Sequence, residues 1–409
     1  MANAEDIITN IIEKVAEEEK LQNCRIVLKP VSTEGANFLS ILYKASVLTA
    51  SRPDFKLFAK VATLPEVYRE QVPVNLVYEA EVSAYTKIVP TYELLQEKYE
   101  IPKEDRFVFP KYYASSLQEN EEAIILEDLT ANGFSMYDRF KPVTFEFASK
   151  AVEELAKFHA LSLAFKNDFP EDYLRDTKEA VQDIVVEEMY KILKKPYKQM
   201  AEVGIKLAPE DIRYKLETFL DKQWEREQFA KYYGASKWGF IVHGDYRPSN
   251  IMFKRQGGKI KQLIPVDYQA VRLGSPCVDL LYFIFSATDE ELRKGYLKPL
   301  LDLYYETLSR FLRLLNIDPE LTFPRRDFDE ELKDKLGYGL STSLSILPIL
   351  MAEGNQGPDG VQNGGLIEHD IKVSEGFLKR FMPVLKEFIA WEIKYKNITL
   401  YNNIIFSCT

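Results

Sequence analysis

The sequence predicts an α+β protein of two lobes, a small N-terminal lobe with an antiparallel sheet and one long helix, and a larger, mainly helical lobe. Three observations support this prediction. Apolar stretches of strand length gather before residue 129, stretches with helical spacing dominate after residue 144, and a strand–loop–hairpin segment at 240–267 interrupts the helices. With 409 residues, the chain is long enough for one or two domains with a large core.

The first lobe is predicted from the period of its apolar residues. Residues 4–20 repeat them at helical spacing, and this helix is expected to pack against the lobe rather than bind a partner. Residues 75–97 predict the long helix, with an apolar stripe along one face. Strands are expected at 24–30, 37–49, 55–62, 106–114 and 122–127.

The second lobe is predicted to be mainly helical. The helix at 144–164 places His159 on its apolar stripe, so this histidine is interpreted as a core residue rather than a ligand. The region 176–233 is expected to be helical with breaks at Pro196 and Pro209. Further helices are expected at 275–286, 290–315 and 372–395.

A glycine-rich segment lies between the last two predicted helices. Residues 354–365 hold five glycines, but they follow no strand and lack the Lys-Ser/Thr pair of a P-loop. We therefore expect a mobile loop near the acceptor site rather than a phosphate-binding loop.

One segment carries the polar residues that indicate chemistry. An apolar strand at 240–242 leads into the tripeptide HGD, which ends at Asp245, and Asn250 follows five residues later. A second apolar run, a Gly-Gly turn at 257–258 and a return strand then deliver Asp267. Strand ends hold such groups more rigidly than free loops do.

An aspartate, an amide and a second aspartate in this order suit phosphoryl transfer from a nucleotide. That reaction needs positioning, charge neutralisation and an acceptor for the hydroxyl proton. Asp245 would accept the proton, and Asn250 and Asp267 would hold Mg²⁺, which takes few protein ligands when phosphates supply others. Singly, each could be an ordinary turn, cap or strand-end residue. Together, their spacing matches the catalytic aspartate and metal-binding residues of protein kinases.

The neighbouring polar residues have more modest interpretations. His243 is expected to position the loop rather than act as a base, and Asp279 is expected to stabilise a helix N-terminus. Gln269 faces either the substrate or backbone groups, and the sequence favours neither. The segment also departs from protein kinases, since HGD replaces HRD, DYQ replaces DFG, and no activation segment with Ala-Pro-Glu follows.

The stretches HGDYRPSNIMFK and VDYQAVRLGSPCVDLLYFIFS resemble the small-molecule kinases of the aminoglycoside phosphotransferase and choline kinase type. They are more similar still to the ecdysteroid kinase-like (CHK kinase-like) family of arthropods, and further matches extend along most of the chain. The resemblance implies a protein-kinase-like fold, with ATP and Mg²⁺ as cofactors. It also implies a nucleotide-binding lobe at 1–129 and a catalytic and substrate-binding lobe at 130–409.

The resemblance assigns roles to a lysine and a glutamate of the first lobe. Lys60, in the strand 55–62, would lie over the nucleotide phosphates. Glu81, four residues before Tyr85 in the family's E-x-x-x-Y pattern, would hold that lysine. Glu79 is a rival that spacing alone does not remove.

Two further nucleotide contacts follow from the same resemblance. The turn 32–37 would cover the phosphates and includes the candidate residue Asn37, although it holds a single glycine. The stretch 126–129 would form the hinge between the lobes, with contacts to the adenine through the main chain at Glu127 and Leu129.

Composition excludes several other classes of protein. A net charge of −10 argues against nucleic-acid binding through a basic surface. Three scattered cysteines and three histidines give neither a disulfide framework nor zinc-ligand spacing. No signal peptide and no membrane-spanning apolar run is recognisable, so we expect a cytoplasmic protein without a membrane partner. The sequence specifies no oligomeric state.

The functional hypothesis is therefore an ATP- and Mg²⁺-dependent kinase that phosphorylates a hydroxyl of a small molecule. By resemblance, the acceptor is an ecdysteroid or a similar steroid or xenobiotic alcohol. A pseudokinase that binds nucleotide without reaction, and a choline- or aminoglycoside-type kinase, are the alternatives, and GTP is an alternative donor. The missing activation segment argues against a protein kinase.

Overall fold

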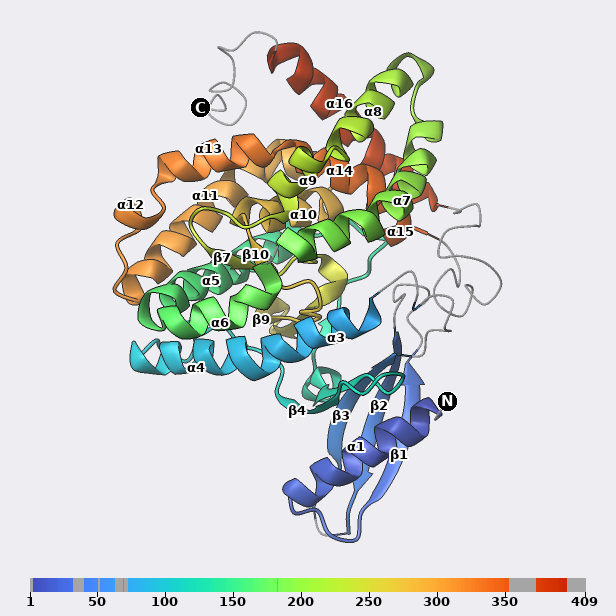
Figure 1. Cartoon of the computed structure of the whole chain (residues 1–409), viewed down its shortest axis with the longest axis vertical. Coiled ribbons are helices and arrows are strands. Elements are labelled where there is room, and N and C mark those ends of the chain that lie inside the picture. The colour runs from blue at the N-terminus through green and yellow to red at the C-terminus, as the bar shows by residue number, and fades with distance from the viewer. Residues whose placement is uncertain are drawn as a thin grey trace.

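A five-stranded antiparallel sheet forms the N-terminal part of the computed structural model, and helices dominate the rest (Figure 1). The predicted α+β architecture is therefore confirmed. The structure describes residues 3–31, 40–50, 52–62, 69, 73–181, 183–352 and 373–395, without the side chains of 178–186, 188 and 391–395.

The strands of the large sheet lie in the order β1–β2–β3–β5–β4. Each neighbouring pair is antiparallel, so short connections suffice between most strands. The strands are β1 (Arg25–Val31), β2 (Ser40–Leu48), β3 (Phe55–Ala62), β4 (Tyr112–Ser116) and β5 (Ala123–Glu127).

The two faces of this sheet bury different partners. Because side chains alternate along a strand, Ala59 of β3 points to one face and Lys60 to the other. The first face packs against helix α1 (Ala4–Glu18), whose residues Ile8 and Ile12 are fully buried there. The N-terminal helix thus packs on the sheet, as its apolar stripe predicts.

The long helix predicted at 75–97 is present but contains a π-helical turn. It consists of α3 (Val74–Ser83), the π turn η1 (Ala84–Ile88) and α4 (Val89–Lys98), without a gap between them. Pro90 lies in the first turn of α4 and has no amide hydrogen, so the preceding turn cannot close an ordinary α-helical ladder and widens instead.

The strand predicted at 106–114 begins later than expected, at Tyr112. Upstream of it, the backbone of Phe107 is paired by a side chain and not by a strand. Its N–H donates to Gln96 Oε1 (2.7 Å), and its carbonyl accepts from Gln96 Nε2 (3.1 Å). A side chain of α4 therefore replaces a sheet partner, which the alternation of apolar residues does not reveal.

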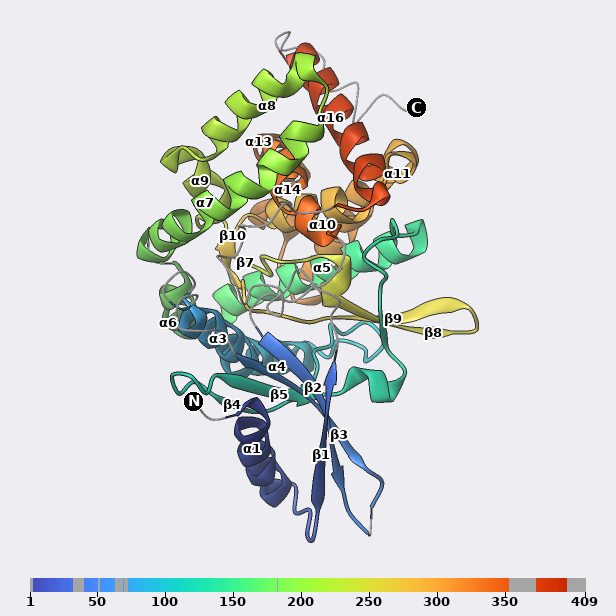
Figure 2. The same ribbon diagram turned by 90° about the vertical axis from the view of Figure 1, so that its right-hand side faces the viewer.

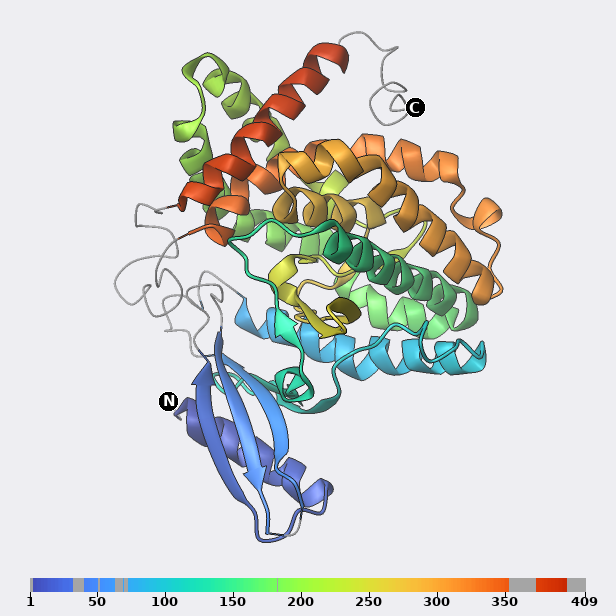
Figure 3. The same cartoon turned by 180° about the vertical axis from the view of Figure 1, so that it is seen from behind.

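Helix α5 (Phe145–Asp168) lies at the centre of the helical part and packs along α11 (Glu290–Leu314), as Figures 2 and 3 show from two sides. The other helices surround this pair. They are α6 (Pro170–Val181), α7 (Asp183–Leu207), α8 (Glu210–Gln223), α9 (Arg226–Tyr233), α10 (Pro276–Ala287), α12 (Pro319–Thr322), α13 (Arg325–Lys335), α14 (Gly337–Ser345), α15 (Leu347–Leu350) and α16 (Glu375–Tyr395).

Two small sheets interrupt the helices. The predicted hairpin is confirmed, and its turn residues Gly257 and Gly258 have the positive φ values, +59° and +80°, of a two-residue hairpin turn. The hairpin extends from the side of the molecule in Figure 2. The strands are β6 (Ser135–Met136), β8 (Ile251–Gln256) and β9 (Lys259–Pro265) in one sheet, and β7 (Phe240–Val242) and β10 (Arg272–Gly274) in the other.

The expected helix break at Pro196 is wrong, because α7 continues through this residue. The ring of the next residue, Tyr197, stacks on Trp224 at 5.6 Å between centroids, and such packing outweighs the local preference of a proline to end a helix. Pro209 does mark a break, at the start of α8. The predicted glycine-rich loop 354–365 lies outside the described residues.

None of the helices within the described ranges combines the length and the apolar character that a membrane crossing requires.

Candidate active site

One lysine ammonium joins three segments that are far apart in the sequence. Lys60 Nζ on β3 donates to Glu81 Oε2 of α3 at 2.8 Å and to Asp267 Oδ1, just after β9, at 2.7 Å. It also donates to Gln269 Oε1 at 3.0 Å. Glu79, the rival by spacing, is exposed on the same helix. The structure therefore brings Glu81 to Lys60, as the resemblance implies.

Burial and the neighbouring charges together shift the pKa of each member of the triad Lys60, Glu81 and Asp267. Burial acts to lower the pKa of Lys60, but Asp267 and Glu81 outweigh it and raise this pKa above its usual value. Burial raises the pKa of Glu81, whereas Lys60 and Arg247 overcome burial and lower the pKa of Asp267. The Glu81 side chain is 3% exposed and that of Asp267 is 22% exposed, so Glu81 loses more hydration.

Two unusual backbone conformations place the acidic residues. Asp267 has a φ of +70°, which few non-glycine residues adopt and which aspartate tolerates better than most. Gly244, directly before Asp245, has a φ of +81°, and a Cβ atom there would overlap the carbonyl oxygen of Ala270 and Nη1 of Arg272. The glycine of HGD is therefore required by the close approach of the chain that enters β10.

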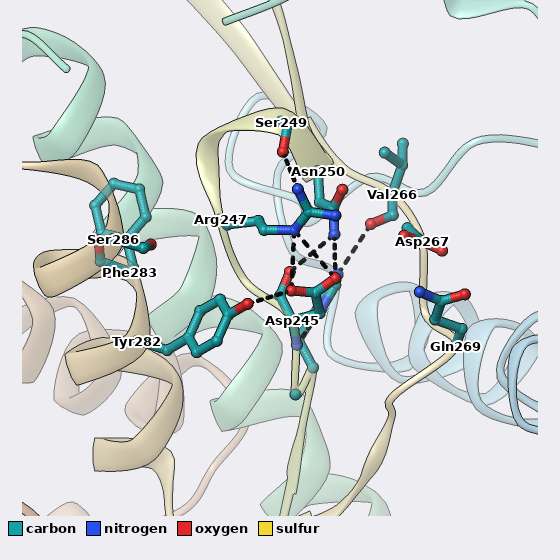
Figure 4. A network of polar contacts seen from close by, with 12 residues as sticks. Asp245, Arg247, Ser249, Asn250, Val266, Asp267, Gln269, Tyr282, Phe283 and Ser286 are labelled. Carbon is teal, nitrogen blue, oxygen red and sulfur yellow. Dashed lines mark hydrogen bonds and ion pairs between the residues drawn. The ribbon is translucent and has the colours of Figure 1, made fainter. Parts of the chain in front are cut away.

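The carboxylate of Asp245 is held by three side chains (Figure 4). Arg247 Nε donates to both of its oxygens at 3.0 and 3.2 Å, and the Tyr282 hydroxyl donates to Oδ1 at 2.6 Å. Asn250 Nδ2 donates to Oδ2 at 2.8 Å and to the Asp245 carbonyl at 3.0 Å. These contacts fix the direction of the carboxylate, which a group that orients a substrate hydroxyl requires.

Asp279, on α10, fixes the loop that carries Asp245 through hydrogen bonds to its backbone. Its Oδ2 accepts from the backbone N–H of His243 at 2.6 Å, and its Oδ1 accepts from the N–H of Gly244 at 2.9 Å. His159, fully buried as predicted, places Nε2 3.3 Å from the same carboxylate. Asp279 therefore orders the loop that carries Asp245, in addition to lying in the first turn of α10.

His243 positions the loop, as the sequence indicates. Its Nε2 lies 3.1 Å from the carbonyl oxygen of Val266, and the N–H of Asp245 donates to its Nδ1 at 3.3 Å. Burial lowers the pKa of His243 and favours the neutral ring, which can donate at one nitrogen and accept at the other.

Asn250 and Asp267 lie at the base of the hairpin β8–β9. The N–H of Val266 donates to the Asn250 carbonyl at 2.9 Å, so paired backbone sets the separation of the two side chains. Since Asn250 Nδ2 faces Asp245, its Oδ1 remains as an acceptor, and no described residue donates to this oxygen or to Asp267 Oδ2. Two such oxygens fit the few protein ligands that Mg²⁺ takes beside phosphates.

A metal site formed by protein side chains alone usually needs three or more His, Cys, Asp or Glu ligands close together. Among the described residues, no cluster of three or more His, Cys, Asp and Glu side chains could hold a metal ion.

Of the two expected hinge residues, Leu129 lies near the hairpin base. Leu129 is buried with Phe134, Met252 and Ile264 in a small apolar cluster. Glu127 ends β5, where its Oε1 accepts from Asn132 Nδ2 at 2.5 Å. Asn37, the candidate of the phosphate-covering turn, lies outside the described residues.

Sequence reasoning missed Arg247 and Tyr282, and left Gln269 open. Arg247 is the second residue after Asp245, so the sequence already shows that the two side chains lie close along the chain. Tyr282 lies in an apolar helix and contacts Asp245 only because α10 packs beneath the loop. Gln269 accepts from Lys60, so it faces the triad rather than the backbone.

A sheet lysine paired with a helix glutamate, close to a hairpin that two aspartates and an asparagine flank, is typical of a kinase-like protein. A sequence profile of the ecdysteroid kinase-like family matches residues 34–317, which is more than half of the chain. The chain belongs to the ecdysteroid kinase-like family.

Comparisons beyond the family give distant similarity. A search of curated proteins finds no matching sequence. Among solved structures, the chain is similar to a GDP complex of a mutant of aminoglycoside 2'-phosphotransferase-IIIa, with a TM-score of 0.47 and 10% identity over 93% of this chain and 98% of that one. The GDP complex of the wild-type enzyme gives a TM-score of 0.44 and 11% identity, over 92% and 98% of the two chains.

Proposed function

We propose that the protein is an ATP- and Mg²⁺-dependent kinase that phosphorylates a hydroxyl of a small molecule. The observation that carries the proposal is the position of Lys60 Nζ, 2.8 Å from Glu81 and 2.7 Å from Asp267. A buried cation held by two carboxylates at a strand end is the arrangement that orients nucleotide phosphates in kinases. Family membership supports an ecdysteroid, or a similar steroid or xenobiotic alcohol, as the acceptor.

The roles follow from the contacts of each residue. Lys60, held by Glu81, would bind the α- and β-phosphates, and Asn250 Oδ1 and Asp267 would hold Mg²⁺. When bound, Mg²⁺ neutralises charge on the phosphates as the transferred group leaves. Main-chain groups near Glu127 and Leu129 would contact the adenine.

The transfer itself needs one proton acceptor. The substrate hydroxyl oxygen bonds to the γ-phosphorus, the bond from that phosphorus to the β-phosphate oxygen breaks, and ADP leaves. Asp245 orients the hydroxyl and takes its proton, while Arg247, 3.0 Å from Asp245, offsets the negative charge of the phosphoryl oxygens.

The test is phosphate transfer from ATP or GTP, with Mg²⁺, to a mixed panel of ecdysteroids, plant steroids, phenolic glycosides, choline and aminoglycosides. Mass spectrometry detects a product that gains one phosphate. We expect that product with the wild type and not with Asp245→Asn, which keeps the size of the side chain but removes the proton acceptor. A wild type that neither forms product nor binds nucleotide with Mg²⁺ would refute the proposal.

The metal role has a separate test. Asp267→Ala should abolish Mg²⁺-dependent turnover while circular dichroism and thermal unfolding remain close to wild type. Near-normal turnover in this variant would remove Asp267 from the metal site. Nucleotide binding without any transfer or hydrolysis in the wild type would favour the pseudokinase alternative.

A further inference from the structure

Gln269, two residues after Asp267, is the neutral partner of Lys60. Its Oε1 accepts from Lys60 Nζ at 3.0 Å, while Glu81 and Asp267 accept the other hydrogens of that ammonium. An ammonium has three donors and no acceptor, so the amide must present its oxygen to the lysine. The Nε2 of Gln269 and its two hydrogens therefore face away from Lys60.

These two hydrogens can be reached by a ligand. Gln269 is half-buried, and no residue in the described part of the chain accepts from its Nε2. This nitrogen is not among the buried side-chain atoms that lack a partner, so solvent reaches it. Figure 4 shows the amide nitrogen on the side of Asp245 and the amide oxygen on the opposite side. The free donors thus point toward the aspartate that is the proposed proton acceptor.

The backbone around Gln269 fixes the direction of its side chain. Asp267 has its positive φ of +70°, and Tyr268 is buried with its ring 4.9 Å from the ring of His243. The N–H of Val271 donates to the Tyr268 carbonyl at 3.1 Å, which closes a four-residue turn with Gln269 at its second position. The side chain is therefore held by this turn and by its contact with the ammonium, as a group that positions a substrate requires.

The amide connects a cation with the expected place of an anion. Lys60 attracts the negative end of the amide dipole, so the positive N–H end points outward. Glu81 and Asp267 already give the lysine two carboxylates, and a third at this position would repel phosphate oxygens. A neutral amide instead accepts from the cation and donates to an anion at the same time.

The direction of the donor identifies the phosphate oxygen that it can bind. In the proposed reaction, Lys60 binds the α- and β-phosphates, and the terminal phosphoryl group lies between that lysine and the hydroxyl at Asp245. The amide oxygen of Gln269 contacts Lys60 and the amide nitrogen lies on the side of Asp245, so the nitrogen faces the terminal phosphoryl group. A nucleoside diphosphate lacks this group and cannot make the contact.

We infer that Gln269 binds the nucleotide through Nε2, which donates to an oxygen of the terminal phosphoryl group, and that this contact distinguishes a nucleoside triphosphate from a diphosphate. This role rests on the proposed kinase function and adds a residue that recognises the phosphate donor. After transfer, the phosphoryl group is bonded to the acceptor, and the diphosphate that remains has lost its contact with Gln269. The same side chain therefore favours binding of the donor and release of the product.

Equilibrium binding tests the contact without turnover. Isothermal titration calorimetry with Mg²⁺ gives the Kd of ADP and the Kd of the non-hydrolysable imido analogue of ATP, and the ratio of the two measures recognition of the terminal phosphoryl group. Gln269→Leu should lower this ratio roughly 10-fold or more, as expected when a hydrogen bond to a charged group is lost. The Kd of ADP should stay within about twofold of wild type, because Lys60 keeps its two carboxylates. The corresponding guanine nucleotides replace these probes if the protein prefers GTP.

Gln269→Glu separates the donor from the acceptor of the amide. Glutamate keeps the size of the side chain and an oxygen for Lys60, but it replaces the N–H donors with a second oxygen. The ratio should fall at least as far as in Gln269→Leu, because a negative charge then faces the phosphoryl oxygens. Gln256→Leu, the same exchange at the exposed end of β8, is the matched control and should leave both constants unchanged. Either Gln269 variant is sufficient if the other does not fold.

A purely structural role of Gln269 gives a different result. If the side chain only supports Lys60, Gln269→Leu weakens ADP and the triphosphate analogue in parallel, and Gln269→Glu restores both. This pattern, or a ratio that neither substitution changes in a wild type that binds both nucleotides, would overturn the role of Gln269 and leave the kinase proposal intact. A wild type that binds neither nucleotide with Mg²⁺ would refute the kinase proposal, and the role of Gln269 with it.

Discussion

At the scale of single residues, Gly244 lets the loop that carries Asp245 approach Ala270 closely, because it has no side chain. Gly244→Ala should destabilise the protein by roughly 2 kcal/mol or more, since it adds a positive-φ strain to an overlap with the Ala270 carbonyl. Displacement of Asp245 should also lower turnover. Urea denaturation and initial rates measure the two effects.

Gly258→Ala is the matched control for this substitution. Gly258 has nearly the same φ, +80°, but a Cβ atom there would meet nothing within 4 Å. The control therefore carries the strain without the overlap and should keep full activity. Equal losses of stability in the two variants would show that the overlap at Gly244 is relieved by a small shift.

Lys60 provides the second prediction at this scale. Lys60→Met should leave Glu81 and Asp267 without their shared cation and lower kcat/KM by roughly 10²-fold or more. Lys56→Met, on the same strand but paired only with Asp54 and Ser46, should remain within about twofold of wild type. Comparable activity in the two variants would contradict the role of Lys60.

His243 gives a prediction for pH. Its folded-state pKa is lowered below 6.5, so the unfolded chain takes up the proton more readily. The free energy of unfolding is therefore unaffected by this group above pH 6.5. It decreases as the pH falls below 6.5, by up to about 1.4 kcal/mol per pH unit for one group. Urea denaturation at pH 7.5 and 5.5 should show a smaller loss in His243→Asn than in wild type, and an unchanged loss would contradict this assignment.

At the scale of elements, Gln96 substitutes for a strand partner of Phe107. Gln96→Leu should leave the Phe107 N–H and carbonyl buried without partners, at a cost of roughly 1–3 kcal/mol in the free energy of unfolding. Gln118→Leu, on an exposed loop, should change this free energy little. Urea denaturation of both variants at neutral pH is the measurement, and equal stability would show that water or another group satisfies the Phe107 backbone.

The helices and strands show which parts of the fold the sequence predicts and which parts it does not. Apolar spacing predicts the helix at 75–97, the hairpin after residue 250 and the helix on the sheet, because each buries one regular face. It misses the delayed start of β4 and the continuity of α7 through Pro196, because Gln96 and Trp224 reach these positions from other elements. Tertiary contacts of this kind leave no periodic signal.

The residues of the candidate site also fall into those that the sequence predicts and those that it does not. Spacing along one segment brings Asp245, Asn250 and Asp267 into a single chemical hypothesis, and the paired strands of the hairpin set the separation of Asn250 and Asp267. Lys60 and Glu81 required the family resemblance, since a lysine in a strand has no local signature. Tyr282 is a residue that no local pattern could reveal, because it reaches Asp245 from helix α10.

At the scale of the whole molecule, the C-terminal helix α16 is tied to the helical core. Arg293 of α11 donates to Glu387 of α16 at 2.9 to 3.2 Å, with the arginine side chain 2% and the glutamate 18% exposed. Glu387→Ala should lower the free energy of unfolding by roughly 3 kcal/mol, because the buried Arg293 loses its carboxylate partner and keeps only the neutral oxygens of Thr288.

Glu290→Ala is the appropriate comparison, since Glu290 pairs with Lys294 on the exposed surface of α11. Thermal and urea unfolding should show little change in this control. If the two glutamate variants unfold alike, Thr288 and water suffice to satisfy Arg293, and apolar residues such as Phe377 and Phe381 hold α16 in place.

The hairpin β8–β9 has a practical consequence for protein engineering. Its base fixes Asn250 relative to Asp267, whereas its tip at Gly257 and Gly258 has open space around it. A foreign peptide inserted between the two glycines would lengthen the tip and leave the paired base in register. The tip is therefore a suitable place to graft an affinity tag or a fluorescent label.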